Sequence, residues 1–495
     1  MKPGVLRENL FARRRAGVLL PIRSLPDGPG NGDIGHTAER FIDFAASCGW
    51  SIWQVLPIGP PDTSGSPYLA KSSSAGDPAL IGLDRLVEWG WIDGFHSDLA
   101  DPDPARIHRQ ERLSAAYRGF RNQADQAWQE RFSDFCRRCD WLEDYALFSA
   151  IDEQEAGASW IFWPEPLRNR APDALEEIRR RHALRMDEIC FEQFLFATQW
   201  EMLREYADRK KISLLGDLPM FVAHHSADVW AHRELFRLHA NGLPAVVAGV
   251  PPDYFSVDGQ LWGNPLYDWD RLTDLGFRWW IDRVRIQIER FDALRLDHFR
   301  GLEACWEIPA EALTARAGRW VKAPGVELLS ALQHVLGPLP LIAEDLGVIT
   351  PEVTALREHF DLPGMRVLQF AFDGMPENPH LPHNHAPHTV VYTGTHDNPP
   401  AAVWATSLDD VTRERLNEYC GRASESIAWT LVLAALASVA RIAIIPVQDW
   451  LELGEGNRVN VPGTSSGNWR WRFQWGSIPD GFSSRSNRWV RFFNR

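Results

Sequence analysis

Three short motifs place carboxyl groups directly after apolar runs, where they could act as a nucleophile, a proton donor or ligands. In the first, Leu294-Arg-Leu-Asp297, an arginine stands two residues before an aspartate. Because side chains alternate along a strand, Arg295 and Asp297 project to the same face. A neighbouring cation lowers a carboxyl pKa, so Arg295 can keep Asp297 ionised and aim it, as a nucleophile requires. An ordinary ion pair at a strand end is the alternative.

The second motif, Ala343-Glu344-Asp345, ends another apolar run. Burial and the like charge of Asp345 would raise the pKa of Glu344, which favours a general acid. A carboxylate that caps the following helix is the alternative, although Thr350, just before Pro351, is the better cap candidate.

The third motif, Thr393-Gly-Thr-His396-Asp397-Asn398, gathers hydrogen-bonding side chains after a further apolar run. Such a cluster can bind the vicinal hydroxyls of a sugar, or it can bind a metal ion. Two carboxylic acids on opposite sides of a glycosidic bond explain the set, because Asp297 could attack the anomeric carbon while Glu344 protonates the departing oxygen. A metal-dependent enzyme that uses these carboxylates together with Asp217 as ligands stays open as a rival.

The elements that position these motifs follow from the hydrophobic pattern. Eight apolar runs alternate with helical patterns, which is typical of a parallel sheet buried on both faces. We therefore predict the α/β class and a (β/α)8 TIM barrel with inserted, mainly helical subdomains. Chemistry in that fold lies at the C-terminal strand ends, where Asp217, Asp297, Glu344 and Asp397 fall. The predicted strands cover residues 17–22, 51–56, 213–217, 293–297, 339–344, 365–370, 389–393 and 442–446, and the helices between them include 36–48, 277–291, 326–335 and 424–439.

The predicted organisation has four parts. Residues 1–83 hold the first part of the barrel with two strands, and residues 84–205 form an inserted helical subdomain. A helix predicted over residues 128–148 carries Cys136 and Cys139, which we interpret as structural thiols. Residues 206–480 complete the barrel and contain an irregular active-site loop at 241–267 that is rich in Gly, Pro and aromatic residues. Residues 481–495 form a C-terminal cap.

The composition narrows the range of partners. A net charge of −14 argues against nucleic acid and anionic membranes, so a neutral small molecule or polymer is the easier ligand. The 23 tryptophans favour a sugar, because indole faces stack on sugar rings. Scattered cysteines and the lack of a secretory signal or membrane span predict a cytoplasmic protein. The other histidines lack a zinc-binding spacing, so they do not predict a zinc site. No phosphate-binding loop motif occurs, so nucleotide cofactors are not expected.

Longer segments carry a resemblance to a known family. The chain resembles the 4-α-glucanotransferases, also called amylomaltases or disproportionating enzymes, in order from about residue 15 to residue 475. The matching segments are Ser66-Pro-Tyr68, Gly216-Asp-Leu-Pro-Met-Phe-Val-Ala223, Val250-Pro-Pro-Asp-Tyr-Phe-Ser256, Leu261-Trp-Gly-Asn-Pro-Leu-Tyr267, Leu294-Arg-Leu-Asp-His-Phe-Arg-Gly301, Ala343-Glu-Asp-Leu-Gly-Val-Ile-Thr-Pro351, Thr395-His-Asp-Asn398, Val447-Gln-Asp449 and Gly467-Asn-Trp469.

The resemblance implies a role for each matching position. It makes Asp297 the nucleophile, Glu344 the acid/base and Asp397 the stabiliser of the transition state. It further implies a retaining mechanism that transfers α-1,4-glucan segments between maltooligosaccharides without a metal or an organic cofactor. The residues expected to contact substrate are Tyr68, which would stack on the sugar at the cleaved bond, Asp217, Arg295, His396 and Asn398 around that sugar, and Asp253 and Trp262 on the acceptor side of the groove.

Three departures from the family pattern bear on substrate preference. Residues 61–65 replace a loop that usually carries a tyrosine and an acidic residue, and Pro399-Pro400 follows Asn398. His225 stands where the family often has an acidic residue. These changes leave the three catalytic carboxylates untouched.

The sequence leaves two rival functions open beside glucan transfer and the metal enzyme. One is a hydrolase of the same chemistry, in which water replaces the acceptor sugar. The other is a glucan-binding protein whose catalysis has decayed, against which the intact Asp297, Glu344 and Asp397 weigh. A monomer or a small homo-oligomer fits the sequence equally well.

Overall fold

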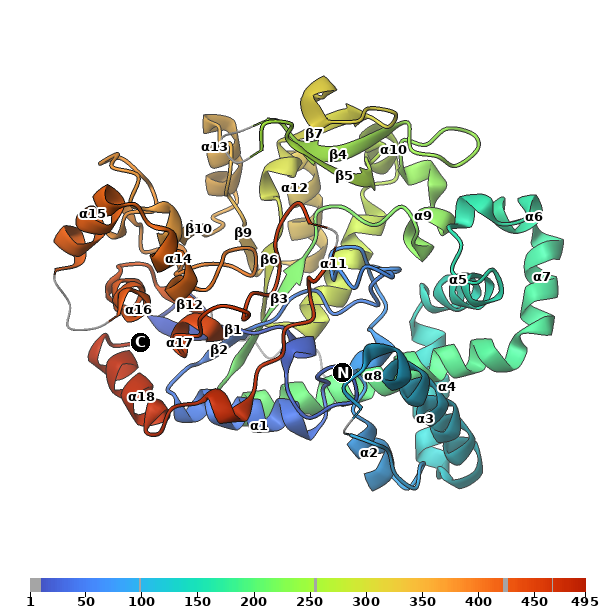
Figure 1. Ribbon diagram of the computed structural model, residues 1–495. Coiled ribbons are helices and arrows are strands. Elements are labelled where there is room, and N and C mark those ends of the chain that lie inside the picture. The colour runs from blue at the N-terminus through green and yellow to red at the C-terminus, as the bar shows by residue number, and fades with distance from the viewer. Residues whose placement is uncertain (1–9, 98, 253–255, 422–425, 465) are drawn as a thin grey trace.

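The eight predicted strands form one parallel sheet that curls into a nearly closed barrel (Figure 1). The computed structural model describes residues 10–97, 99–252, 256–421, 426–464 and 466–495. The backbone N–H of Ala343 donates to the carbonyl of Pro363 at 2.8 Å where the first and last strands of the sheet meet. The predicted (β/α)8 barrel is therefore confirmed. Its strand order is β10 (Gly364–Val367), β11 (Thr389–Tyr392), β12 (Ile442–Pro446), β1 (Arg15–Leu19), β2 (Ile52–Gln54), β3 (Ser213–Leu218), β6 (Ala293–Leu296) and β9 (Leu341–Ala343).

Helices surround the barrel, and four of them lie where the hydrophobic pattern predicts a helix, namely α1 (His36–Ser47), α11 (Arg278–Arg290), α12 (Gly325–Leu336) and α16 (Ile427–Ala437). The helix predicted from residue 424 begins at Ile427, and residues 422–425 lie outside the described residues. In the described part of the chain, no helix is both long and apolar enough to cross a bilayer. Further helices around the barrel are α13 (Pro351–His359), α14 (Ala401–Ser407), α15 (Asp410–Cys420), α17 (Val447–Trp450) and α18 (Phe482–Phe492), the last of which contacts α1 and α16.

Strand alternation decides which side chains fill the barrel. On β6, Ala293 faces the barrel interior with Leu215 and Ile342, whereas Leu294 packs outward into the large core beneath the helices. Since side chains two residues apart share a face, Arg295 lies above Ala293 inside the barrel. The interior is thus apolar at its centre and becomes polar at the C-terminal strand ends.

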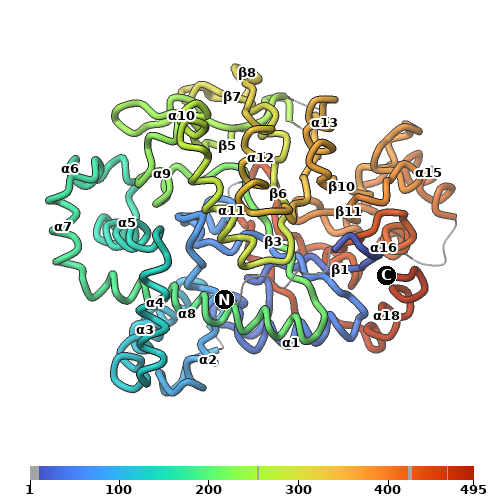
Figure 2. Tube along the Cα trace, turned by 180° about the vertical axis from the view of Figure 1, so that it is seen from behind, coloured from blue at the N-terminus to red at the C-terminus, as the bar shows by residue number. Residues whose placement is uncertain are grey.

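A group of helices stands at one side of the barrel, opposite α14–α16 and α18 (Figures 1 and 2). The long helix α8 contacts α1 and leads directly into β3, so it crosses the boundary predicted at residue 205. The group comprises α2 (Leu83–Glu88), α3 (Pro102–Gln123), α4 (Gln126–Arg138), α5 (Leu142–Gln154), α6 (Glu165–Arg168), α7 (Pro172–Arg181) and α8 (Ala183–Lys210), and we call α3–α8 the helical insert.

The prediction of a single helix over residues 128–148 is wrong. Two helices, α4 and α5, meet at Cys139, which has φ −101° and ψ 84°. The chain breaks there because α4 buries only the face around Phe132, whereas α5 is buried on most sides. A straight helix could not satisfy both packing demands.

The segment at 241–267 also differs from its prediction as an irregular loop. It contains β4 (Val246–Val250) and β5 (Gln260–Pro265), which join β7 (Ala304–Pro309) and β8 (Arg319–Lys322) in an antiparallel sheet. The backbone of β5 approaches so closely that a Cβ at Gly249 would lie 2.1 Å from the carbonyl of Gln260. Because Gly249 has no side chain, it allows this pairing but also interrupts the alternation of apolar and polar residues by which the strand could be predicted.

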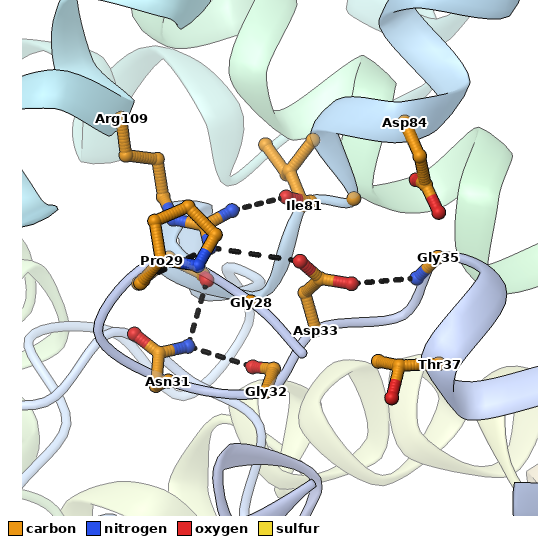
Figure 3. A network of polar contacts seen from close by, with 12 residues as sticks. Gly28, Pro29, Asn31, Gly32, Asp33, Gly35, Thr37, Ile81, Asp84 and Arg109 are labelled. Atoms are coloured by element: carbon orange, nitrogen blue, oxygen red, sulfur yellow. Dashed lines mark hydrogen bonds and ion pairs between the residues drawn. The ribbon is translucent and has the colours of Figure 1, made fainter. Parts of the chain in front are cut away.

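Helix α3 supplies a buried cation to the loops that follow β1 and β2 (Figure 3). Arg109, which is 4% exposed, donates to the carbonyls of Ile81 and, at 3.3 Å, Pro29. It also lies 3.6 Å from the carboxylate of Asp33, which accepts the N–H of Gly35 at 3.1 Å. Burial raises the pKa of Asp33 to about 6, and the guanidinium opposes that shift. The helical insert therefore holds both loops in place.

We expect Arg109→Met to lower the free energy of unfolding by about 3–5 kcal/mol, because it leaves the buried Asp33 without its cation. Chemical denaturation followed by circular dichroism measures the change. The control is Arg106→Met on the exposed face of α3, which should stay within about 0.5 kcal/mol of wild type. Equal denaturation midpoints for Arg109→Met and wild type would contradict the assignment.

Candidate active site

A buried arginine joins two carboxylates at the mouth of the barrel. Asp217 on β3 stands directly opposite Arg295 on β6 in the sheet register. Arg295 donates through Nη1 to both carboxylate oxygens of Asp217, at 2.9 and 2.8 Å, and through Nη2 to Asp297 at 2.7 Å. Burial lowers the pKa of Arg295, but the charges of Asp217 and Asp297 outweigh it and raise that pKa well above its ordinary value. The expected contact between Arg295 and Asp297 is present.

Three aromatic rings gather beside this arginine. The hydroxyl of Tyr68 donates to Asp217 at 2.7 Å, and burial raises the pKa of Tyr68. Its ring stacks on that of His396, with centroids 5.3 Å apart and planes 20° from parallel. The indole of Trp469 lies 5.9 Å from both rings. The loops after β2 and β11 thus meet the 457–472 segment at one point.

Glu344 follows β9 and is held against the residue next to Asp297. Its Oε2 accepts the backbone N–H of His298 at 2.7 Å, and its Oε1 accepts that of Leu346 at 3.2 Å. Burial raises the pKa of Glu344 to about 8; Arg295 opposes the shift, and the charge of Asp297 adds to it. The side chain is therefore protonated at neutral pH, as the sequence predicts.

Asp345 plays a smaller part in that shift than the sequence suggests. Its carboxylate turns away and accepts the backbone N–H of Met365 at 2.7 Å, with Arg366 3.3 Å and Arg357 3.4 Å from it. Among the causes of the raised pKa of Glu344, burial is the largest and Asp345 the smallest.

Asp397 receives its orientation from a distant part of the chain. Asn460 donates through Nδ2 to Oδ1 of Asp397 at 2.7 Å, and Arg458 donates to its backbone carbonyl at 2.6 Å. The Nε2 atom of His396 lies 3.3 Å from the same Oδ1. Among the described residues, the contacts of the Asp397 side chain are therefore made through Oδ1.

Of the remaining predicted site residues, two support the residues of this centre and one lies outside the described residues. The amide oxygen of Asn398 accepts the N–H and the hydroxyl of Thr395, both at 2.9 Å, so it stabilises the turn that carries Asp397. Trp262 on β5 meets the ring of His298 edge to face at 4.8 Å. Asp253 lies outside the described residues.

Two residues of this centre are missing from the sequence prediction of substrate contacts. Asn460 and Trp469 belong to the segment 457–472, whose described residues form no helix or strand. The motif Gly467-Asn-Trp469, which is part of the family resemblance, is the sequence signal that could have indicated Trp469. In the structure Trp469 has φ +64°, a backbone conformation that a bulky residue rarely adopts.

The contacts of Arg295 also decide against a metal centre built on these carboxylates. The guanidinium occupies the position between Asp217 and Asp297 that a bridging cation would need. Within the described residues, no group of three or more His, Cys, Asp or Glu side chains is arranged to hold a metal ion. The donor set suits hydrogen bonding to an uncharged polar ligand.

A cleft of about 1390 Å³ lies elsewhere, between the helical insert and α11. Charged side chains and the indoles of Trp141 and Trp279 line it, but none of the predicted site residues does.

The chemistry belongs to the barrel mouth, where one carboxylate is bound to a guanidinium and a second carboxyl group holds a proton. Such a division between two carboxyl groups is the arrangement of a nucleophile and a general acid.

Comparisons with known proteins show what the chain as a whole is similar to. A family model described as 4-alpha-glucanotransferase matches residues 20–478. The chain is 47% identical over 478 residues to the 4-alpha-glucanotransferase of Thermus thermophilus, covering 94% of this chain and 96% of that protein. It is 44% identical over 499 residues to that of Synechocystis sp., covering 98% and 99%. An amylomaltase from Streptococcus agalactiae, solved in complex with acarbose, matches with a TM-score of 0.94 at 34% identity and covers 98% of this chain and 100% of that one.

Glu344→Gln should become increasingly more stable than wild type as the pH rises from 4.5 to about 8. Over that range the unfolded chain releases the Glu344 proton while the folded chain keeps it, so the wild type loses stability. Glutamine does not titrate. Thermal unfolding midpoints across this range measure the difference, with Glu311→Gln at an exposed position as the control. A difference that is independent of pH would contradict the raised pKa.

Proposed function

The chain belongs to the 4-α-glucanotransferase family, and from this premise we propose that Asp297, Glu344 and Asp397 transfer glucan segments by a retaining double displacement. The family resemblance of the sequence motifs is confirmed, and with it the enzymatic activity, the transfer of α-1,4-glucan segments. The observation that carries the residue roles is the pairing of an arginine-bound Asp297 with a protonated Glu344.

In the first step, a carboxylate oxygen of Asp297 bonds to the anomeric carbon of the donor. The bond from that carbon to the glycosidic oxygen breaks, and the proton of Glu344 passes to the departing oxygen. The leaving glucan carries this proton away as a new 4-hydroxyl group. The sugar is then esterified to Asp297, and Glu344 is an anion.

In the second step, the 4-hydroxyl of an acceptor gives its proton to Glu344 and its oxygen attacks the anomeric carbon. The ester to Asp297 breaks, and both carboxyl groups return to their starting states. Asp397, which Asn460 orients through Oδ1, stabilises the positive charge of the oxocarbenium-like transition state.

The substrates we propose are α-1,4-glucans and maltooligosaccharides. Support comes from the amylomaltase of Streptococcus agalactiae, which was solved with acarbose. The clustered rings of Tyr68, His396 and Trp469 offer an apolar face for the sugar at the cleaved bond and exclude water from it. Asp253 and Trp262 would contact the acceptor. The cytoplasmic location and the oligomeric state stay predictions from the sequence.

Maltotriose incubated with the protein should yield a ladder of longer maltooligosaccharides together with glucose. Transfer produces both, because a chain segment moves from one molecule to the 4-hydroxyl of another. Chromatography of the products measures the ladder, and a strong chelator in a parallel reaction should leave it unchanged. Maltose and glucose alone would support the hydrolase instead, and no product at all would support a glucan-binding protein.

Exogenous azide should distinguish the two catalytic carboxyl groups when α-maltosyl fluoride is the donor. Without the nucleophile, azide attacks from the vacated side, so Asp297→Gly should release β-maltosyl azide. Glu344→Ala should release α-maltosyl azide, because azide attacks the ester on Asp297 from the opposite side. We expect Glu344→Ala to lower turnover of maltotriose by about 10²–10⁴-fold and that of the fluoride less, since fluoride leaves without a proton.

Nuclear magnetic resonance of the azide products reads the anomeric configuration. Near wild-type turnover of maltotriose by either variant, or α-maltosyl azide from Asp297→Gly, would contradict the roles proposed here.

A further inference from the structure

We propose that Asp152, on α5 of the helical insert, is a positioning residue that holds Tyr68 in the active site. The inference rests on the proposed function, because Tyr68 acts there on the sugar at the cleaved bond. Asp152 itself touches neither Tyr68 nor any of the three catalytic carboxylates in the contacts of the described residues. Its effect passes through the loop that carries the tyrosine.

That loop is closed on itself at its base. The backbone N–H of Lys71 donates to the carbonyl of Pro60 at 2.7 Å, and that of Asp62 donates to Leu69 at 3.0 Å. Tyr68 lies three residues before Lys71 within the closed loop. A displacement of Lys71 therefore moves Tyr68 with it.

Asp152 binds the base of this loop by charge. The ammonium of Lys71 donates to Oδ2 of Asp152 at 2.7 Å, and the Asp152 side chain is 8% exposed. Burial alone would raise the pKa of Asp152, but hydrogen bonds from His225 and Lys71 outweigh it and lower that pKa. The contact is a partly buried ion pair, with the Lys71 side chain 27% exposed, and a charge-assisted hydrogen bond of this kind is stronger than one between neutral groups.

The second oxygen of Asp152 reaches the loop that follows β3. The Nε2 atom of His225 lies 2.8 Å from Oδ1 of Asp152. Because Nδ1 of His225 accepts the backbone N–H of Trp160 at 3.2 Å, the ring proton must stand on Nε2 and point to the carboxylate. The carbonyl of Lys71 also accepts the N–H of Ala227, at 2.8 Å. One carboxylate thus ties the loop after β2 to the loop after β3, which follows the strand of Asp217.

Other side chains hold the residues that follow Lys71 in the chain, from Ser73 to Gly82. Asp228 on α9 (Ala227–Ala231) accepts both the N–H and the hydroxyl of Ser73, at 2.8 and 2.6 Å. Gln193 and Gln199 on α8 each make two hydrogen bonds to one glycine, accepting its backbone N–H and donating to its carbonyl. The glycines are Gly76 and Gly82 respectively. Among these contacts, the one between Asp152 and Lys71 lies nearest to Tyr68 in the chain, so loss of Asp152 affects the site most directly.

The experiment compares Asp152→Asn with wild type in the transfer reaction of maltotriose. Asparagine keeps the shape and can still accept from His225, but it loses the charge that binds Lys71. We expect kcat and kcat/KM to fall together by about 10- to 100-fold, since a small misplacement of a substrate-positioning group has that effect. The matched control is Glu153→Gln, which removes the neighbouring charge from an exposed pair with Arg185 and should leave kcat unchanged.

A double-mutant cycle with Tyr68→Ala separates positioning from a general loss of stability. If Asp152 acts through Tyr68, Asp152→Asn should change kcat by less than about 2-fold once the tyrosine is absent. Loss of folded protein would instead lower kcat by the same factor in both backgrounds. Lys71→Met breaks the same contact from the loop side and should reproduce the fall in kcat even if Asp152→Asn does not fold.

Two outcomes would overturn the proposal. One is wild-type kcat in a folded Asp152→Asn or Lys71→Met variant, and the other is a fully multiplicative cycle. Both leave the proposed function intact, because wild-type protein still makes the product ladder. Failure of the wild type to make that ladder would refute the proposed function separately.

Discussion

The active site depends on one buried cation, the guanidinium of Arg295. It lies in the barrel interior, where burial makes any unpaired charge costly, and it donates to Asp217 and Asp297 together. Burial raises the pKa of Asp217, and the guanidinium of Arg295 opposes that rise. The burial of Glu344, together with the charge of Asp297, keeps a proton on Glu344. Arg295 therefore binds Asp297, the nucleophile that we propose, whereas burial keeps the proton on Glu344, the acid that we propose.

The barrel supplies this arrangement through its register. Asp217 and Arg295 are partners across the β3–β6 pair, and both point inward because they stand two residues after the interior positions Leu215 and Ala293. A shift of one residue in that pairing would turn the pair away from the site. The loops above the strands have no such register. The helical insert fixes them instead, through Arg109 and the side chains around Asp152, so it belongs to the catalytic structure.

The sequence predicted well where pattern and chemistry coincide within a few residues. The run 293–297 shows both a buried strand and the contact between Arg295 and Asp297, so strand, face and ion pair follow from it together. The pattern failed where distant partners decide the structure. Strands β4 and β5 join their sheet through the pairing of β4 with β7, whose partner residues lie 57 to 63 positions further along, and a glycine at the close contact hides their alternation. Asn460 and Trp469 reach Asp397 and His396 from a segment without regular pattern. The helix across Cys139 was predicted from local periodicity, which cannot show that α4 and α5 pack in different directions.

What the sequence alone determined is the set of parallel strands, the carboxyl groups at their ends and, by resemblance, the family. These follow from residue type and from the alternation of apolar residues that indicates burial. Both can be recognised in a few consecutive residues, so the order of the chain contains them. What the tertiary structure decided is the sharing of Arg295 between two carboxylates, the burial that leaves Glu344 protonated and the anchoring of the Tyr68 loop by Asp152. Each of these joins residues between about 50 and 80 positions apart, and the strength of each depends on how much water the complete fold excludes from the contact.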